Sequence, residues 1–172
     1  MTFSVIAIAI LVVAANEAVA AAIRAAALPE GQSIWLVRGI FVVTDHENVL
    51  SWNFSTVGKA LFQLVVVPVA LLWLIRAADA WLRPKSLPGG LLRTAAGLLL
   101  GGAVANGVEL VTRGARVTDY LAMVSFQGPS LPVRAEIYNL GDLSVDLAGI
   151  SAAVGLALTL LASRRARGME GQ

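Results

Sequence analysis

Residues 101–109 read Gly-Gly-Ala-Val-Ala-Asn-Gly-Val-Glu, and residues 138–142 read Tyr-Asn-Leu-Gly-Asp. The first stretch ends one long apolar segment and the second begins another, so both segments are expected to be membrane helices. Glu109 and Asp142 then lie at the same membrane face, and each follows an Asn by three residues, on the same side of its helix. Two carboxylates near one membrane boundary are suited to general acid–base chemistry.

The composition is that of an integral membrane protein. Of the 172 residues, 58% are hydrophobic and only 14% are charged, which is too apolar for an ordinary soluble domain. The formal net charge is +2, and the basic residues are scattered, so we expect no nucleic-acid partner. The sequence contains no Cys, which excludes a disulfide, a thiol nucleophile or a cysteine metal site.

The apolar segments predict an all-α integral membrane protein, a four-transmembrane-helix bundle in a single domain covering residues 1–172. The expected helices are 3–28, 57–81, 91–112 and 137–163. Between the first two helices, residues 29–56 carry β-branched and aromatic residues bounded by turn formers. This pattern predicts a small, outward-facing β-rich interfacial region. Residues 113–136 form a second outward connection.

Two features of these segments refine the prediction. A signal peptide is the alternative for residues 3–28, but no Lys or Arg precedes the apolar run, and a retained helix is the better interpretation.

In the third segment, Gly97, Gly101 and Ala105 repeat every four residues. Such a stripe of small residues allows another helix to approach closely.

Basic residues indicate the orientation. They flank the loop between the second and third segments and follow the fourth: Arg76, Arg83, Lys85, Arg93, Arg164, Arg165 and Arg167. Because Lys and Arg are enriched in cytoplasmic loops, this loop and both termini are expected on the cytoplasmic side. Glu109, Asp142 and both connections then face outward.

Three ordered blocks resemble the lipoprotein signal peptidase family, also called signal peptidase II. Residues 101–109 are similar to its Gly-Gly-Ala-x-Gly-Asn-x-x-Asp pattern. Residues 114–120, Gly-Ala-Arg-Val-Thr-Asp-Tyr, are similar to its Gly-x-Val-Val-Asp-Phe region. Residues 138–142 are similar to its Phe-Asn-x-Ala-Asp block. The order and spacing of the blocks agree across the whole chain.

The resemblance implies a membrane aspartic endopeptidase that needs no metal or organic cofactor. Asp142 takes the place of one catalytic aspartate and Glu109 that of the other, and supporting residues match Asn106, Asn139 and Asp119. The implied reaction cleaves the signal peptide of a diacylglyceryl-modified prolipoprotein before its lipidated Cys, at the outer face of the bacterial cytoplasmic membrane. The expected partners are these prolipoproteins and membrane lipids, and the protein is expected to be a monomer.

Several positions depart from the family pattern. The family has Asp in place of Glu109, and its Asp-Gln-x-x-Lys pattern faces residues 16–20, Asn-Glu-Ala-Val-Ala. Its interfacial Asn could be matched by either Asn48 or Asn53. Since Glu extends the carboxyl by about 1.5 Å relative to Asp, the alternative is a catalytically impaired paralogue that binds lipidated or apolar peptides without cleaving them.

Asp146 lies one helical turn beyond Asp142. A carboxylate inside the membrane is costly and usually functional, so we hypothesise that Asp142, Asp146 and Glu109 form one acidic cluster. A structural role for Asp146 is an equal alternative. A third hypothesis is a small carrier or proton-relay protein that uses this cluster, although a transporter would place its acids near the membrane midplane.

Overall fold

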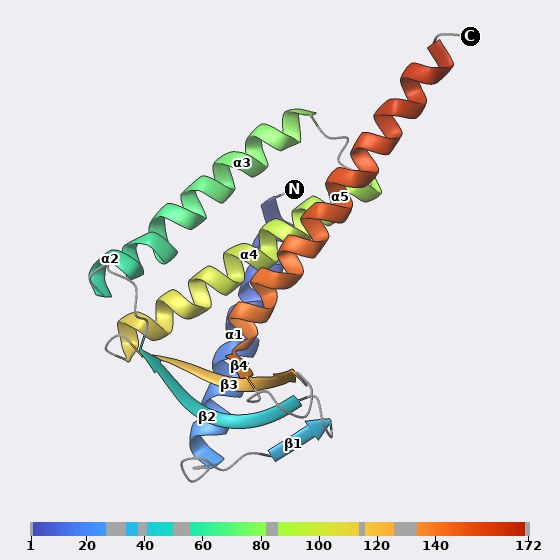
Figure 1. Ribbon diagram of the computed structural model, residues 1–172. Helices are drawn as coiled ribbons and strands as arrows, with labels where there is room; N and C mark the ends of the chain where they lie inside the picture. Colours follow the sequence, from blue (N-terminus) through green and yellow to red (C-terminus); the bar gives the residue numbers. More distant parts are fainter. Residues whose placement is uncertain are drawn as a thin grey trace.

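The computed structural model describes residues 2–26, 34–37, 41–49, 56–81, 86–113, 116–125 and 134–170. Figure 1 shows the long helices running alongside one another, with the strands gathered at one end. Asn53, a candidate for the interfacial Asn, lies outside the described residues. The backbone of Asn48, the other candidate, belongs to a strand and pairs with Val117.

Three long helices dominate the structure: α1 (Thr2–Ala26), α4 (Leu87–Thr112) and α5 (Leu140–Glu170). Within the described parts of the chain, three helices are long and apolar enough to cross a membrane, namely Phe3–Ala26, Leu87–Thr112 and Leu140–Arg164. Each has 24 to 26 residues, which at about 1.5 Å per residue exceeds a hydrocarbon core of about 30 Å. The chain is therefore a membrane protein built mostly from helices.

The start of α4 follows from its local sequence. Ser86 precedes the helix, and its Oγ accepts a hydrogen bond from the Gly89 N–H at 3.2 Å, as an N-cap does. Pro88 lies in the first turn, where its missing N–H costs no helical hydrogen bond. The helix consequently begins before residue 91, where the sequence analysis placed its start.

The second predicted segment contains three consecutive helical pieces: α2 (Thr56–Leu61), the π-helical turn η1 (Phe62–Val66) and α3 (Val67–Trp81). The Val67 N–H bonds to the Phe62 carbonyl, five residues back, directly before Pro68. Proline cannot donate within a helix, and a π-helical turn is one way to accommodate the missing bond. The apolar part of this segment, Val57–Trp73, is shorter than the three long helices.

α4 is the central helix and packs on three sides. A Cβ at Gly101 would lie 2.6 Å from the Val12 Cβ of α1, so this side of the small-residue stripe faces α1. A Cβ at Gly102 would clash with the Gly141 carbonyl oxygen of α5. These approaches leave no room for larger side chains, and they pack α4 closely against α1 and against the start of α5.

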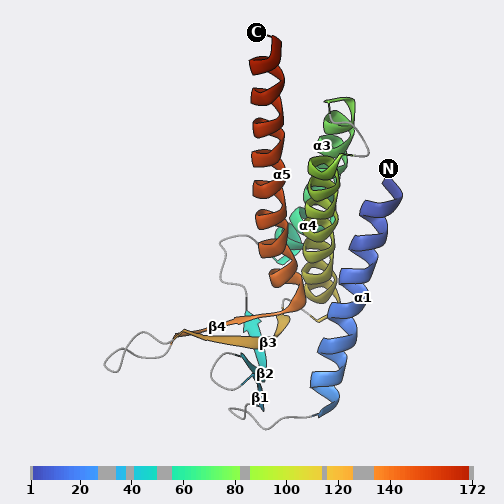
Figure 2. The same ribbon diagram turned by 90° about the vertical axis from the view of Figure 1, so that its right-hand side faces the viewer.

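The four strands form one antiparallel sheet in the order β1 (Ile34–Val37), β2 (Phe41–Val49), β3 (Arg116–Ser125) and β4 (Arg134–Tyr138). The sheet lies at one end of the helices, and Thr2 and Glu170 lie toward the other end (Figure 2). The first two strands fall within residues 29–56, whereas β3 and the first residues of β4 fall within the connection 113–136. Both connections therefore contribute to one sheet.

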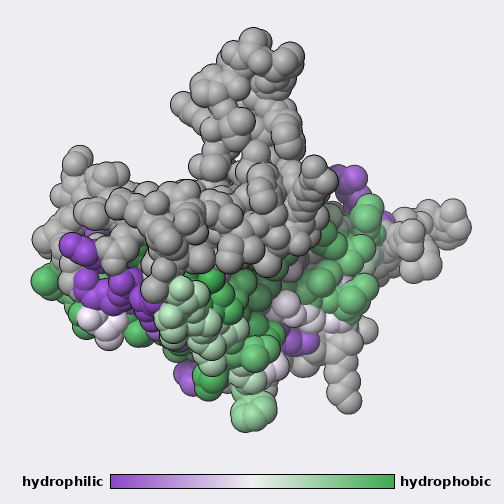
Figure 3. All heavy atoms as spheres, turned by 90° about the horizontal axis from the view of Figure 1, so that it is seen from below, coloured by the Kyte–Doolittle hydropathy of each residue, from purple (hydrophilic) through white to green (hydrophobic). Residues whose placement is uncertain are grey.

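The described helices carry many exposed apolar side chains. Leu11 on α1 is 68% exposed and Ile150 on α5 is 61% exposed. Seen from the sheet end, hydrophobic residues cover much of the described helix surface (Figure 3). Extensive apolar surface on long helices is expected where lipid surrounds the protein.

Candidate active site

The helix ends and the sheet meet at three consecutive residues of β3. Thr118, Asp119 and Tyr120 are all buried, with exposed fractions of 3% or less. Each of them hydrogen-bonds to a different helical partner at the sheet end of the bundle. This part of β3 therefore carries side chains between the ends of α1 and α4 and the start of α5.

Asn139 and Asp142 form the start of α5. The Asp142 N–H donates to Asn139 Oδ1 at 2.9 Å, and the Asn139 N–H donates to Asp142 Oδ2 at 3.3 Å. Asn106 of α4 joins them, because its Nδ2 donates to Asp142 Oδ1 at 2.8 Å. Both oxygens of the Asp142 carboxylate are thus held by asparagine residues.

A second carboxylate reaches the same asparagine. Asn139 Nδ2 donates to Asp119 Oδ1 at 3.0 Å and to Asn106 Oδ1 at 3.0 Å. Asn139 is fully buried, while Asp142 is partly exposed. The structure therefore gathers Asp119, Asp142, Asn106 and Asn139 into one hydrogen-bonded group, which we call the acid–amide group.

Glu109 belongs to a different group of contacts. It is fully buried, and its Oε1 lies 3.0 Å from Arg24 Nη1 in an ion pair. Its Oε2 accepts from the Thr118 N–H at 2.6 Å. Both oxygens of the Glu109 carboxylate therefore bind residues outside the acid–amide group.

Asp146, the third member of the predicted acidic cluster, is exposed on α5. It lies one turn beyond Asp142 along that helix. Among the described residues, no group of three or more His, Cys, Asp or Glu side chains is arranged to hold a metal ion.

Tyr120 ties the start of α5 to α1. Its hydroxyl donates to Asn16 Oδ1 at 3.1 Å and accepts from the Leu140 N–H at 2.9 Å. The Gly141 N–H also donates to Asn16 Oδ1, at 3.3 Å. Burial raises the pKa of Tyr120 to about 12, despite the opposing effect of the Leu140 hydrogen bond. The phenol is therefore a neutral structural link at physiological pH.

Sequence reasoning missed Arg24, Thr118 and Tyr120 as neighbours of the site. The only part of the site with a local sequence signal is the start of α5, because Asn139 and Asp142 have the N-x-x-acid spacing of a capping box. No local pattern indicates the partners of Arg24 or Tyr120, because both reach residues more than 80 positions away.

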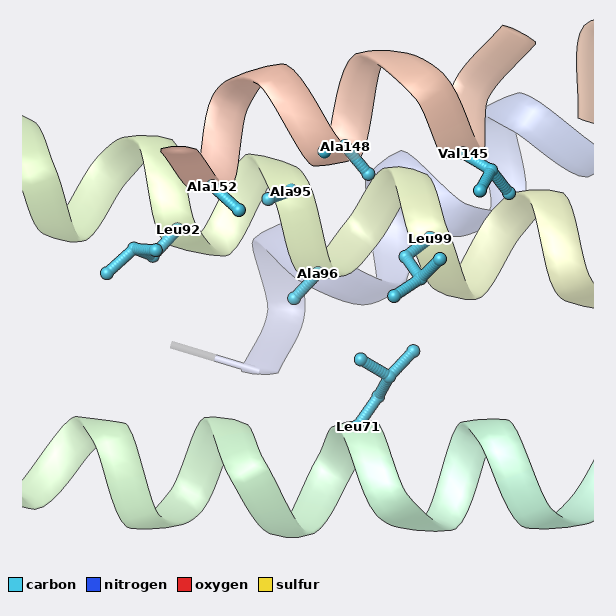
Figure 4. A pocket seen from close by; sticks show the side chains of 9 residues that line it. Leu71, Leu92, Ala95, Ala96, Leu99, Val145, Ala148 and Ala152 are labelled. Carbon is cyan, nitrogen blue, oxygen red and sulfur yellow. The ribbon is translucent and has the colours of Figure 1, made fainter. Parts of the chain in front are cut away.

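An apolar cleft lies beside the site between α3, α4 and α5 (Figure 4). Its volume is about 370 Å³, and its lining residues include Leu71, Leu92, Leu99, Val145, Ala148 and Ala152. The α5 lining residues follow Asp142 in steps of three or four, so they continue its side of the helix away from the sheet.

The fold and the site define a small helical membrane protein with two aspartates in one hydrogen-bonded group at the end of its bundle. A family model described as signal peptidase (SPase) II matches residues 5–161. The chain belongs to the signal peptidase II family, a family of membrane proteases. A comparison with curated proteins finds no significant match.

Two solved structures of bacterial membrane enzymes share this fold. One, determined at 2.3 Å resolution, is 22% identical with a TM-score of 0.67, covering 90% of this chain and 87% of the other. The second, determined at 1.9 Å resolution, is also 22% identical, with a TM-score of 0.68 and coverages of 89% and 92%. At this identity the likeness concerns the fold.

Proposed function

We propose that this protein is a membrane aspartic endopeptidase that removes signal peptides from diacylglyceryl-modified prolipoproteins, before the lipidated Cys. The family supports the reaction, and the acid–amide group supports the choice of residues. The carboxylate pair in this proposal is Asp142 with Asp119, in place of the sequence-predicted Glu109. The observation that carries it is that buried Asn139 bonds to both aspartate carboxylates: its Nδ2 donates to Asp119 Oδ1, and its backbone N–H donates to Asp142 Oδ2.

A pair of neighbouring carboxylates can divide the two proton transfers of peptide hydrolysis. Two such groups do not both ionise easily, so they share one proton. The ionised member takes a proton from water as the water oxygen bonds to the scissile carbonyl carbon. The protonated member gives its proton to the leaving amine when the C–N bond breaks. The water is consumed, and the pair ends with one proton, ready for another turnover.

The asparagines keep the two carboxylates in place during this reaction. Asn106 and Asn139 bond to each other and to the aspartates, and Asn139 is fully buried. Preorganised donors of this kind avoid the cost of reorganising solvent as charge moves. In the proposed reaction they position the pair, and neither asparagine exchanges a proton with the substrate.

The apolar cleft supports an apolar substrate segment. It begins about one helical turn from Asp142 and is lined by aliphatic side chains of three helices (Figure 4). A signal peptide whose cleavage point reaches Asp142 can place its apolar segment against this stripe of α5. In this proposal α2, η1 and α3 complete four spans, both termini are cytoplasmic, and the site opens toward the outer face of the cytoplasmic membrane.

The test is a cleavage assay on a purified diacylglyceryl-modified prolipoprotein. We expect Asp142→Asn and Asp119→Asn each to lower the rate by about 10²- to 10⁴-fold, the range for loss of a general acid or base. Asp146→Asn should retain cleavage, which separates the pair from a wider acidic cluster. Full activity of Asp119→Asn would contradict the proposed pair. Failure of the unmutated protein to cleave, with retained substrate binding, would favour the non-cleaving paralogue.

A further inference from the structure

Three elements are joined by charged contacts outside the acid–amide group. Arg24 lies in the last turn of α1, Glu109 in the last turns of α4, and Thr118 in β3. The Arg24 Nη1 atom donates to Glu109 Oε1 and to Thr118 Oγ1, both at 3.0 Å. Arg113 also donates to Thr118 Oγ1. One threonine of the sheet is therefore fixed by the ends of two membrane helices.

The burial of this group makes its pairing necessary. Glu109 and Thr118 are fully buried, and the Arg24 side chain is 30% exposed. A buried carboxylate without a partner is strongly unfavourable. Removing either Arg24 or Glu109 alone should therefore destabilise the folded protein or displace the neighbouring residues. The ion pair therefore holds the end of α1 against the end of α4.

The two Glu109 oxygens serve different elements. One binds Arg24 and the other accepts from the Thr118 backbone N–H at 2.6 Å. Thr118 is the residue directly before Asp119, so this backbone contact restrains the position from which the Asp119 side chain extends toward Asn139. A Glu109 side chain shorter by one C–C bond, about 1.5 Å, could not keep both contacts without movement.

We infer that Arg24 and Glu109 are positioning residues that hold β3 so that Asp119 reaches the acid–amide group. Neither residue touches the reacting atoms. Glu109 acts through the Thr118 backbone N–H and Arg24 through the Thr118 hydroxyl, so the role of Glu109 differs from that of a catalytic acid. This inference rests on the proposed function, because it concerns the rate of the same cleavage.

The test separates the ion pair from the backbone contact. The exchange variant Arg24→Glu/Glu109→Arg keeps two opposite charges but removes the acceptor for the Thr118 N–H. Glu109→Asp keeps the charge and shortens the side chain. Arg76→Gln, at an exposed position on α3, is the control for loss of a basic residue. Steady-state cleavage, thermal unfolding and amide exchange of residues 116–125 are measured for each protein.

We expect both site variants to lose about 10- to 100-fold in kcat with KM changed by less than about twofold, because a displacement near 1 Å has effects of this size. Amide exchange in β3 should rise in both, and Arg76→Gln should behave as the unmutated protein. The exchange variant should unfold at a moderately lower temperature than the unmutated protein, because opposite charges remain but the buried Thr118 N–H loses its acceptor.

Wild-type kcat in the exchange variant would overturn the inference, since a purely structural ion pair is restored by exchange. If the charge-exchange variant does not fold, Glu109→Asp is the deciding variant. The inference is overturned if Glu109→Asp has the kcat of the unmutated protein and the same rate of amide hydrogen exchange in β3. If the unmutated protein cleaves no prolipoprotein, the proposed function fails. Amide exchange then still shows whether Glu109 holds β3, since it does not depend on catalysis.

Discussion

Asn139 and Asp142 cap each other at the start of α5. The Asp142 N–H donates to Asn139 Oδ1 at 2.9 Å, and the Asn139 N–H donates to Asp142 Oδ2 at 3.3 Å. This is the reciprocal arrangement of a capping box, with the acid at the third position of the helix. Because Asn139 Nδ2 also donates to Asp119, the residue that caps the helix also contacts the other aspartate of the proposed catalytic pair.

Asn139→Ala should therefore affect activity more than stability. Loss of an N-cap costs about 1 kcal/mol of the free energy of unfolding. Loss of the Nδ2 donor removes one contact that positions Asp119, and we expect cleavage to fall by about 10²-fold or more. Asn139→Asp is the matched variant, because Asp also caps a helix but cannot donate to Asp119. Its unfolding temperature should fall, because a further carboxyl is buried beside Asp119 and Asp142, and its cleavage should be lost; wild-type cleavage would contradict the role assigned to Nδ2.

Gly141→Ala should disturb the acid–amide group directly. A Cβ at Gly141 would lie 2.8 Å from both Asn106 Oδ1 and Asn139 Oδ1, so the two amides must move. We expect cleavage to fall by at least about tenfold. Gly90→Ala on α4 is the control, since a Cβ there meets nothing within 4 Å and Ala favours a helix. Equal cleavage by the two variants would show that the amide positions are unimportant.

The helices were the predictable part of this structure. Apolar segments of membrane-spanning length are visible locally, and the helix Leu87–Thr112 differs from the predicted 91–112 mainly at the Ser86 cap. The predicted range 3–28 likewise differs from the helix Thr2–Ala26 by only one or two residues at each end. Such segments need no knowledge of distant residues.

The grouping of Asp119 with Asp142 around Asn139 was not predictable from the same information. Glu109 and Asp142 occupy equivalent places on their own helices, which made them the natural pair. Asp119 enters the acid–amide group only because β3 joins a sheet with β2 and β4, whose register depends on residues far away in sequence. Likewise, the reach of Arg24 to Glu109 depends on how α1 packs against α4.

Ala152→Leu should test the apolar cleft as a substrate-binding surface. Ala152 lines the cleft on α5, well beyond Asp142, so a larger side chain fills the space without touching the carboxylates. We expect KM to rise several-fold with kcat nearly unchanged, as for a contact equally strong in the ground and transition states. A wild-type KM would indicate that lipid, and no part of the substrate, occupies the cleft.

Tyr120 should give the protein a stability limit at alkaline pH. The ordinary pKa of a tyrosine is 10.0, and burial raises that of Tyr120 to about 12 in the folded state. The folded protein therefore holds this proton more tightly than the unfolded chain. The stabilisation, up to about 3 kcal/mol, is fully present below pH 10 and is lost as pH rises from about 10 to 12.

Tyr120→Phe should remove this pH dependence while lowering stability at neutral pH. The Leu140 N–H loses its acceptor and Asn16 loses one donor, which costs about 1–3 kcal/mol. The sequence has only two tyrosines, so Tyr138→Phe leaves Tyr120 as the single group seen by tyrosinate absorbance. We expect its titration midpoint in the folded protein to lie near 12. A midpoint near 10, with unfolding that is insensitive to pH between 10 and 12, would show that the hydroxyl does not link α1, β3 and α5 as described.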